Sequence, residues 1–394
     1  MILPSDLKDF IDNNLNKDLK KLALQKNPFP DYDWKWILNQ IQAKQKAEKK
    51  LPTWFNSTEV IFPSVLSVEQ TSSESLAAYK ASLLSGKKLI DLTGGFGVDA
   101  FYFSKRFEKV THCEFQEDLS AIVKHNFEIL QAKNIQTISG DSISYLKNTP
   151  ETFDWIYIDP ARRDQQKSKV FLLKDCTPNV VELQELLFQK SQNVLIKTAP
   201  LLDIRSILNE IKHVKSIHAI ALNNEMKELL IVIEKDFCDE PELIATNILL
   251  DGSVISHSFA LDDKEFATLS QPQNYLYEPY SSYLKTGQYN TIAQRFNVNK
   301  LHKHSHLYTS NEWVDFPGRC FKIEQILSYN KKDIKILENT KGNVTTRNFP
   351  LKVEEIRKKH KIKEGGDTYI FFTTNLKNEK IVVVCKKVLK EKQV

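Results

Sequence analysis

The residues whose types and order most clearly suggest chemistry are an acid followed by proline, Asp159-Pro160. They directly follow the apolar stretch 153–158, which predicts a strand. Proline fixes its own φ and restricts the residue before it, so the turn holds the Asp159 carboxylate and the neighbouring carbonyls in one direction. Such a turn can accept hydrogen bonds from an exocyclic amine and hold the nitrogen lone pair in one direction. We therefore predict that Asp159 and Pro160 position a nitrogen acceptor for group transfer.

Two adjacent arginines, Arg162 and Arg163, follow this turn. A guanidinium can stack on a base or hold a phosphate through two hydrogen bonds. The sequence lacks the second proline and the aromatic residue that, in the common form of this turn, stacks on a flipped base. We predict a catalytic role for Arg162 and a phosphate-bearing substrate held by both arginines. The alternative is that they only pair with acids such as Asp175 or Glu182.

A glycine-rich turn, Asp91-Leu92-Thr93-Gly94-Gly95-Phe96-Gly97, follows an apolar strand and precedes an amphipathic helix. Strand, turn and helix in this order open α/β nucleotide-binding sheets, whose ligands lie beyond the carboxyl ends of the strands. The spacing Gly95-x-Gly97-x-x-Ala100 also fits a dinucleotide site, so the glycines alone do not identify the cofactor. Asp91 does, because it would repel a pyrophosphate and attract the ammonium and sulfonium of S-adenosylmethionine. We predict S-adenosylmethionine as the cofactor.

Acids also follow the next two predicted strands. Glu114 stands 17 positions after Gly97 and can accept hydrogen bonds from both ribose hydroxyls, which suits a nicotinamide dinucleotide equally well. Asp141 can accept from the adenine amino group, or it can cap the helix that begins after it. Thr71-x-x-Glu74 fits a capping box, and the same segment is placed to cover the cofactor pocket. At Asp141 and at Thr71, the sequence does not decide between capping a helix and contacting the cofactor.

These positions make up the predicted site. The predicted cofactor-binding residues are Thr71, Ser72, Asp91, Thr93, Gly94, Gly95, Gly97, Asp99, Glu114, Asp141 and Ser142. The predicted substrate-binding residues are Arg162, Arg163 and Lys197. No metal is expected. His302, His304 and His306 would share one face of a strand, but no acid or cysteine stands beside them at ligand spacing, which favours a surface or interface strand.

Strands and helices alternate regularly after the glycine-rich turn, which predicts a parallel, doubly wound sheet. Two further strands, 214–222 and 227–234, are predicted to form an antiparallel hairpin, which is characteristic of class I methyltransferases rather than dehydrogenases. The motifs at strand ends resemble those of class I S-adenosylmethionine-dependent methyltransferases. The stretches 69–74, 91–99, 159–163 and 365–370 resemble the bacterial methyltransferases with a THUMP-like domain. The resemblance implies a Rossmann-like catalytic domain, a ferredoxin-like segment, a THUMP-like domain and an RNA substrate.

The predicted domains follow that division. They are an N-terminal helical region at 1–60, a methyltransferase domain at 61–236, a ferredoxin-like or linking segment at 237–310 and a basic α+β THUMP-like domain at 311–394. Residues 275–308 are expected to be helical, and a helix is expected near 324–329. Between residues 311 and 394, 19 Lys and Arg stand against 11 Asp and Glu, which makes this module a plausible RNA platform.

Composition excludes several classes of protein. The 41% hydrophobic and 27% charged residues among 394 are those of an ordinary globular protein of two or three domains. Five cysteines without CxxC spacing argue against a disulfide framework and a zinc ribbon. No signal peptide or membrane-spanning run is recognisable, so we expect a cytoplasmic, reduced protein.

The resulting interpretation is a cytoplasmic methyltransferase that acts on an exocyclic amine of a base in structured RNA, either tRNA or rRNA. One alternative is a methyltransferase of a small molecule or protein, in which the basic module dimerises or docks a partner. Another is an RNA-binding factor that binds S-adenosylmethionine without catalysis. The sequence does not distinguish oligomeric states.

Overall fold

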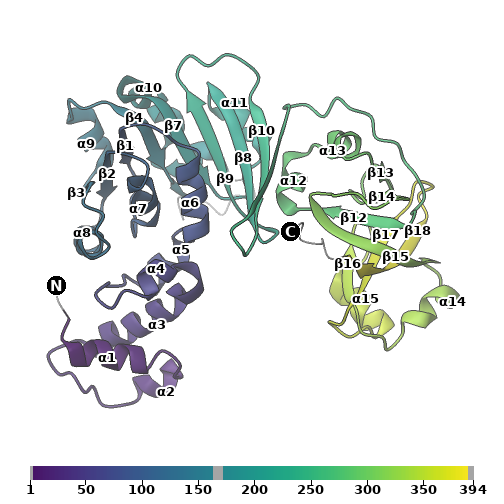
Figure 1. Ribbon diagram of the computed structural model, residues 1–394, viewed down its shortest axis with the longest axis horizontal. Helices are drawn as coiled ribbons and strands as arrows, with labels where there is room; N and C mark the ends of the chain where they lie inside the picture. The colour runs from purple at the N-terminus through teal and green to yellow at the C-terminus, as the bar shows by residue number, and fades with distance from the viewer. Residues whose placement is uncertain (1–2, 163–171, 389–394) are drawn as a thin grey trace. The chain divides into compact units, whose positions relative to one another are not determined.

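The computed structural model describes residues 3–162 and 172–388 and divides into two compact units (Figure 1). The first unit comprises Met1–Lys215 with Leu229–Asp239, and the second comprises Ser216–Glu228 with Glu240–Val394. Each unit is described by itself. The predicted boundaries at residues 60, 236 and 310 remain a proposal, and Arg163 lies outside the described residues. No helix in the described part of the chain is long and apolar enough to cross a membrane.

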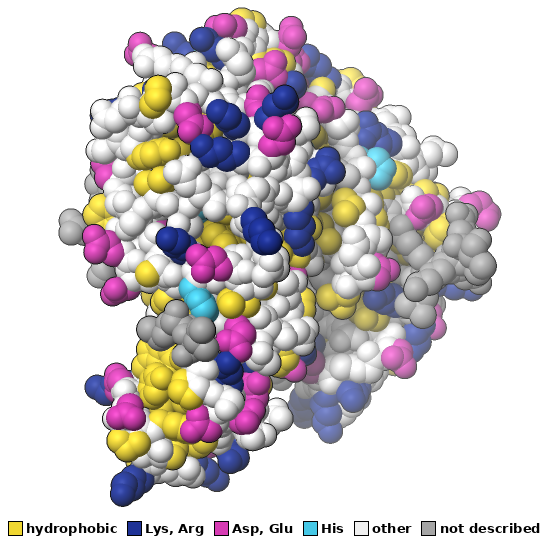
Figure 2. Space-filling model, turned by 60° about the vertical axis from the view of Figure 1, so that its left-hand side comes forward, with side chains coloured by type: hydrophobic (Ala, Val, Ile, Leu, Met, Phe, Trp, Pro, Cys, Tyr) yellow, Lys and Arg dark blue, Asp and Glu magenta, His cyan; other side chains and the backbone are white. Residues whose placement is uncertain are grey.

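The first unit begins with short helices around an aromatic cluster. They are α1 (Ser5–Asn13), α2 (Leu19–Ala23), α3 (Trp34–Lys50) and α4 (Pro52–Phe55). The N-terminus of α3 is capped by Asp33, whose carboxylate accepts the Lys35 N–H at 3.0 Å. The ring centroid of Phe10 lies 5.3 Å from that of Phe29 and 6.0 Å from that of Trp34. In Figure 2, apolar side chains gather over these helices at the lower left.

The core of the first unit is a sheet in the order β9-β7-β4-β1-β2-β3. Its strands are β1 (Lys88–Asp91), β2 (Lys109–Glu114), β3 (Ile135–Ser139), β4 (Phe153–Ile158), β7 (Ser191–Thr198) and β9 (Glu225–Glu234). Neighbouring strands pair in parallel except β7 with β9, which pair antiparallel. The predicted parallel sheet is confirmed. The carboxyl ends of β1, β2 and β4 meet at one edge, which brings the acids that follow them together.

Of the other helices in this unit, two precede β1, and the rest follow it between strands as the alternation predicted. They are α5 (Val65–Gln70), α6 (Glu74–Ser82), α7 (Val98–Ser104), α8 (Glu117–Ile129), α9 (Ser142–Asn148), α10 (Val180–Lys190) and α11 (Ile204–Glu210). After β4 the chain forms a two-stranded ladder of β5 (Ala161–Arg162) and β6 (Cys176–Thr177), the latter preceded by the turn η1 (Leu173–Asp175). The structure describes the backbone of Arg162 but not its side chain.

The predicted hairpin is present as β8 (Val214–Leu222) followed by β9. Its two loop residues, Asn223 and Asn224, have φ of 48° and 68°. Positive φ at both positions is what a two-residue hairpin turn requires, and asparagine adopts it readily. The tip of the hairpin belongs to the second unit, where β10 (Glu242–Ile248) pairs in parallel with β8 and β11 (Val254–Phe259) pairs antiparallel with β10.

The second unit also contains a sheet in the order β13-β14-β12-β15-β18-β17-β16. Its strands are β12 (Tyr275–Pro279), β13 (Asn299–Lys300), β14 (Tyr308–Ser310), β15 (Gly318–Ser328), β16 (Asn343–Thr346), β17 (Thr368–Thr374) and β18 (Lys380–Lys387). Its helices and turn are α12 (Ser281–Thr286), α13 (Tyr289–Arg295), α14 (Lys331–Ile334), η2 (Lys335–Leu337) and α15 (Val353–His360). The predicted α+β module is confirmed.

Two local predictions in this unit are wrong. Residues 275–279 form a strand instead of beginning a helix, and residues 324–328 continue β15. The segment 324–329 is rich in helix formers, but pairing of Gln325 to Ser328 with β18 outweighs that weak local preference. The three alternating histidines lie between β13 and β14, outside any strand. Among the described residues, no group of three or more His, Cys, Asp or Glu is placed to hold a metal ion.

Candidate active site

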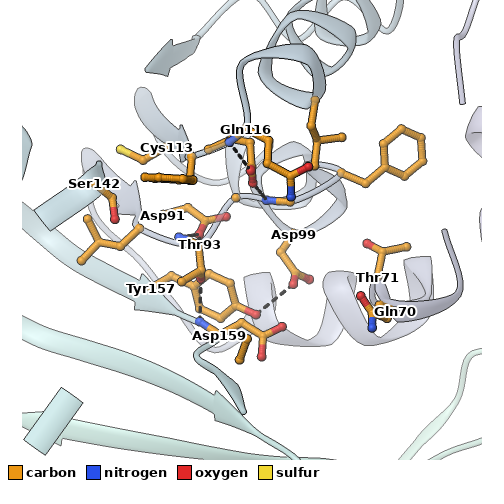
Figure 3. Close-up of a pocket in the computed structure, with 18 of the residues that line it drawn as sticks. Gln70, Thr71, Asp91, Thr93, Asp99, Cys113, Gln116, Ser142, Tyr157 and Asp159 are labelled. Carbon is orange, nitrogen blue, oxygen red and sulfur yellow. Dashed lines mark hydrogen bonds between the residues drawn. The ribbon is translucent and has the colours of Figure 1, made fainter. Parts of the chain in front are cut away.

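A cavity of about 990 Å³ opens at the carboxyl edge of the sheet in the first unit (Figure 3). It is lined by the end of α5, the glycine-rich turn, the end of β2, the start of α9, the end of β4 and Lys197 of β7. The predicted residues that line it are Thr71, Ser72, Asp91, Thr93, Gly94, Gly95, Asp99, Glu114, Asp141, Ser142, Asp159 and Lys197. The buried Pro160 and Gly97 lie outside the lining.

The glycine-rich turn is held by hydrogen bonds to both neighbouring strand ends. The Thr93 N–H donates to the Asp91 carboxylate at 2.9 Å, and the Gly95 N–H donates to Glu114 Oε2 at 2.9 Å. A Cβ at Gly94 would lie 2.2 Å from the ring of His112, so only glycine fits there without movement. Gly97 has φ +79°, and a Cβ on it would lie 2.6 Å from Phe127, so its role is packing beneath the turn.

Negative charge is concentrated around this cavity. Among the described lining residues, five are acids (Asp91, Asp99, Glu114, Asp141 and Asp159), and Lys197 is the single Lys or Arg. Burial raises the pKa of Asp91 well above its ordinary value, and the nearby carboxylates of Asp99 and Asp159 raise it further. A cation beside Asp91 would relieve this repulsion, because an opposite charge favours the ionised carboxylate. The cavity is therefore suited to a cationic ligand.

Asp141 and Glu114 orient the polypeptide as well as facing the cavity. Asp141 caps α9, because its carboxylate accepts the Ile143 N–H at 3.0 Å and the Ser144 hydroxyl at 2.6 Å. These bonds, the Ser144 hydroxyl foremost, lower the pKa of Asp141. Asp141 is therefore the N-cap of α9, as one of the two predictions had it. Its exposed side chain also lines the cavity, as the other requires. Glu114 accepts from the N–H groups of Gly95 and Gln116.

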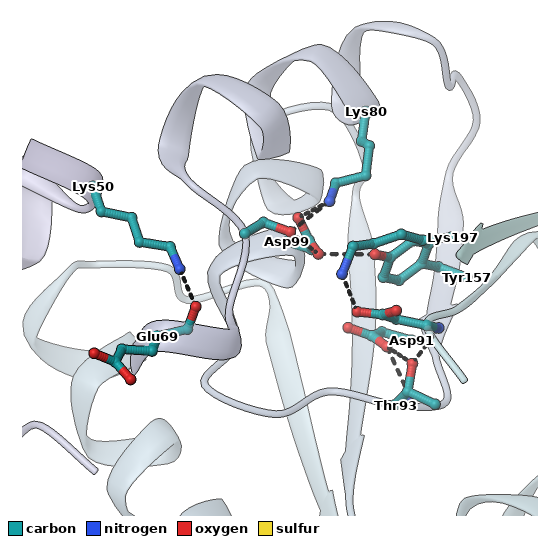
Figure 4. Close-up of polar contacts among 10 residues, drawn as sticks. Lys50, Glu69, Lys80, Asp91, Thr93, Asp99, Tyr157 and Lys197 are labelled. Atoms are coloured by element: carbon teal, nitrogen blue, oxygen red, sulfur yellow. Dashed lines mark hydrogen bonds and ion pairs between the residues drawn. The ribbon is translucent and has the colours of Figure 1, made fainter. Parts of the chain in front are cut away.

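A buried lysine lies behind the acids (Figure 4). Lys80 of α6 is fully buried; its Nζ lies 2.9 Å from Asp99 Oδ1 and donates to Ser72 Oγ at 2.6 Å. Asp99 Oδ2 accepts from the Ser72 hydroxyl at 3.0 Å and the Tyr157 hydroxyl at 2.8 Å. Burial would raise the pKa of Asp99, but the charges of Lys80 and Lys197 outweigh that effect, so the pKa is lowered. Asp99 is therefore a fixed anion facing the cavity.

Asp159 is anchored through its backbone and its side chain. Its N–H donates to Thr93 Oγ1 at 2.7 Å, which ties the end of β4 to the glycine-rich turn. Its carboxylate forms an ion pair with Lys197, whose side chain is 16% exposed against 35% for Asp159. Lys197, which was predicted to bind substrate, lines the cavity and pairs there with the predicted catalytic acid.

Sequence reasoning missed several lining residues. The described ones not predicted include Leu66, Ser67, Gln70, Phe96, Cys113, Phe115, Gln116, Ile143, Tyr157, Thr177 and Pro178. Tyr157 could have been found, because it stands two residues before Asp159 on a strand and so lies on the same side. The capping box at Thr71 is wrong. Thr71 ends α5, and Ser73 caps α6 by accepting the Leu76 N–H.

Comparisons with known proteins fit this arrangement. The chain matches the family models of a THUMP domain-like module at residues 318–387, a ferredoxin-like domain at 275–317 and conserved hypothetical protein 95 at 41–216. A solved structure from Porphyromonas gingivalis, named as a candidate methyltransferase, is 28% identical with a TM-score of 0.87 and covers 99% of this chain and 100% of its own. These similarities support a class I S-adenosylmethionine-dependent methyltransferase with a THUMP-like domain.

Two curated relatives match shorter stretches. An uncharacterized RNA methyltransferase of Protochlamydia amoebophila is 26% identical over 180 residues, which is 42% of this chain and 40% of that protein. A second, from Mycoplasma mobile, is 28% identical over 95 residues, or 24% of this chain and 26% of that protein. The chain thus spans less than half the length of either relative. The resemblance predicted from the sequence is confirmed, as is the combination of a Rossmann-like sheet with ferredoxin-like and THUMP-like domains.

Proposed function

We propose that this protein transfers a methyl group from S-adenosylmethionine to an exocyclic amine of a base in structured RNA, either tRNA or rRNA. The observation that carries the proposal is the acid-lined cavity with Asp159 at the end of β4. Glycine at position 94 is required by contact with the His112 ring, which lets the turn pack closely on β2. The turn and the surrounding acids suit a nucleoside that carries positive charge.

Each part of the cofactor would have a matching group. S-adenosylmethionine, when bound, supplies an electrophilic methyl group on a sulfonium. Asp91 and Asp99 would face the cationic methionine end, with Asp99 kept ionised by Lys80. Glu114 would accept hydrogen bonds from the ribose, and Asp141 from the adenine amino group. Thr71 and Ser72 would close the pocket from the segment between α5 and α6.

Asp159 would orient the acceptor. Its carboxylate accepts N–H hydrogen bonds from the amine, which points the nitrogen lone pair toward the methyl group. The cofactor would supply its methyl group to this nitrogen and leave as the thioether, and the proton that the nitrogen gives up would pass to water. Lys197 holds the Asp159 carboxylate from the side of β7, and Pro160 fixes the backbone that follows. Roles for Arg162 and Arg163 at the rim remain predictions from the sequence.

An RNA substrate is supported by the modules of the second unit and by the relatives named as RNA methyltransferases. Phosphate contacts from a basic module supply affinity without reading sequence. We accordingly place the reaction in the cytoplasm, where tRNA and rRNA are found.

The first experiment measures transfer of labelled methyl from S-adenosylmethionine to bulk RNA from cells that lack this protein. Wild type, Asp159→Ala and the control Glu185→Gln, an exposed acid on α10, are compared. We expect Asp159→Ala to lower transfer at least about 100-fold while calorimetry shows little change in cofactor affinity. Digestion to nucleosides then identifies the base.

Three outcomes would contradict the proposal. Equal transfer by Asp159→Ala would remove Asp159 from the reaction, and joint loss of transfer and cofactor affinity would make it a structural residue. Cofactor binding without label in RNA would favour a non-RNA acceptor or a binding factor without catalysis.

A further inference from the structure

The second unit contains one buried acid held between two arginines. Glu278 of β12 is 2% exposed, and its register partner on β15 is Arg319. The Arg319 Nε donates to Glu278 Oε2 at 2.6 Å, and the same guanidinium forms an ion pair with that oxygen through Nη2. Arg347, which follows β16, donates from Nη2 to the other oxygen, Oε1, at 2.7 Å. Each carboxylate oxygen therefore fixes one guanidinium.

The two arginines are partly open to solvent, whereas the acid is not. Their side chains are 31% and 36% exposed, so the three residues together present one net positive charge outward. A guanidinium has five N–H donors, and Glu278 engages only some of them. Within the described part of the chain, Arg347 Nε is buried without a hydrogen-bond partner. The arrangement leaves oriented donors beyond those that the acid uses.

Two aromatic rings lie beside Arg319, and a nearby histidine stays uncharged at neutral pH. The guanidinium of Arg319 lies 5.6 Å from the ring centroid of Phe321 and 5.9 Å from that of Tyr369. Aromatic rings on this side restrict where the guanidinium can turn. Burial, with the charges of Lys300, His304 and Arg347, lowers the pKa of His306 to about 4. That histidine therefore adds no charge at neutral pH, and the fixed cations dominate.

We propose that Arg319 and Arg347, held apart and oriented by Glu278, form a site for one backbone phosphate of the RNA substrate. Planar guanidiniums match phosphate oxygens through paired hydrogen bonds, and pre-orientation lowers the entropy lost on binding. This inference rests on the proposed function, because it takes RNA as the ligand. Diffuse attraction by a basic surface would be weakened by Glu278, because this acid lowers the local positive charge. The proposed site instead requires Glu278, because the acid orients both arginines.

The test measures binding of total tRNA to the full-length protein as a function of salt. Glu278→Gln decides between the two explanations, because it adds one positive charge and loosens both arginines. Diffuse attraction predicts tighter binding by this variant. The proposed site predicts binding weaker by about threefold to tenfold, and equal or tighter binding would overturn it.

Two substitutions of Arg347 provide the second measurement. Arg347→Lys keeps the charge and Glu278 paired but loses the planar fork, so we expect weaker binding with an unchanged salt slope. Arg347→Gln should weaken binding about tenfold and reduce the slope of log affinity against log salt by about one. The control Lys264→Gln removes one exposed charge of the same unit outside the site. If the Arg347 variants bind no more weakly than this control, the site is not used.

Folding and the proposed function are checked in the same samples. Thermal unfolding and cofactor affinity should match wild type in the arginine variants, so that lost RNA binding is not lost structure. If the wild-type protein itself binds no tRNA, the RNA substrate falls together with the phosphate site. If wild type binds and the variants behave as the control does, only the phosphate site falls.

Discussion

Each unit contains an ion-paired cluster with a buried member, and the two buried members carry opposite charges. In the first, the buried member is a cation, Lys80, and the acid that it holds, Asp99, faces the cavity. In the second, the buried member is an acid, Glu278, and the two arginines that it holds are about one-third exposed. A buried charge must be paired, so the partner that reaches the surface carries the opposite sign. In these two clusters, the sign of the buried member therefore sets the sign that the cluster presents.

This difference separates the two ligands that the protein is proposed to bind. The cavity would present its five acids to a cofactor that carries a sulfonium and an ammonium. The second unit would present guanidiniums to a polyanion. In both places the buried residue touches no ligand, so its contribution is to fix the charge and direction of a neighbour. Substitutions at the buried and the exposed member of each pair should consequently have different effects.

The largest effect is expected for Asp99→Ala, because it leaves the fully buried Lys80 without its anion. Removing one partner of a buried pair costs about 3–5 kcal/mol of unfolding free energy. Lys80→Met should cost less, about 1–2 kcal/mol, because Asp99 keeps its bonds from Ser72 and Tyr157. Urea denaturation of both single variants measures the two free energies.

The double variant Lys80→Met with Asp99→Ala tests whether the larger loss of stability in Asp99→Ala comes from the unpaired Lys80. Replacing both members of a buried pair by apolar groups is often nearly neutral, so the double variant should be more stable than Asp99→Ala alone. A double variant as unstable as the sum of the single changes would show that the two charges are not coupled. Lys80 could then not be said to fix the charge of Asp99 in the first unit.

A smaller effect, on turnover, is expected for Lys197→Met. The substitution releases the Asp159 carboxylate and removes the single described Lys or Arg of the lining. We expect the rate constant for transfer to fall about 10- to 100-fold because Asp159 is no longer held in place. Affinity for S-adenosylmethionine should stay the same or increase, since the cavity becomes more negative. Single-turnover transfer and calorimetry measure the two quantities.

Lys197→Arg is the matched control, because it retains the positive charge beside Asp159. It should recover most of the transfer rate lost in Lys197→Met. A large loss of cofactor affinity in Lys197→Met would contradict the view that the cavity attracts its cofactor through negative charge.

The sequence predicted those parts of the site that depend on local chain direction. Asp91, Glu114 and Asp159 were placed correctly at one edge because parallel strands bring their carboxyl ends together, and the strands themselves were marked by apolar runs. The hairpin was predicted from the two strand-like runs at 214–222 and 227–234, and the structure adds that its turn residues, Asn223 and Asn224, have positive φ.

Residues whose role depends on packing between elements could not be predicted. Lys80 reaches Asp99 only because α6 packs against α7, and nothing in its own helix marks that contact. Glu278 and Arg347 are 69 residues apart and meet only in the folded unit. The wrong helix at 324–329 has the same origin, because pairing with β18 decided a segment of weak local preference.

The smallest expected effect concerns two histidines, one in each unit. His112 and His306 each have a pKa of about 4 in the folded protein against 6.5 ordinarily. Between these values the unfolded chain binds protons that the folded protein does not, so stability is fully present above pH 6.5 and is lost as pH falls toward 4. His112→Gln and His306→Gln should each reduce the acid sensitivity of the unfolding free energy.

Added salt should change the pKa of one histidine and not the other, which tests whether fixed positive charge surrounds His306 in the second unit. Burial dominates both lowered pKa values, but His306 is also affected by the cations Lys300, His304 and Arg347, whereas no cation contributes to the shift of His112. Added salt screens charges and leaves burial unchanged, so the pKa of His306 should rise and that of His112 should not. Ring resonances followed by NMR give both values in one sample. Arg347→Gln should likewise raise the pKa of His306 alone, and an unchanged pKa in that variant would argue against fixed positive charge around the proposed phosphate site.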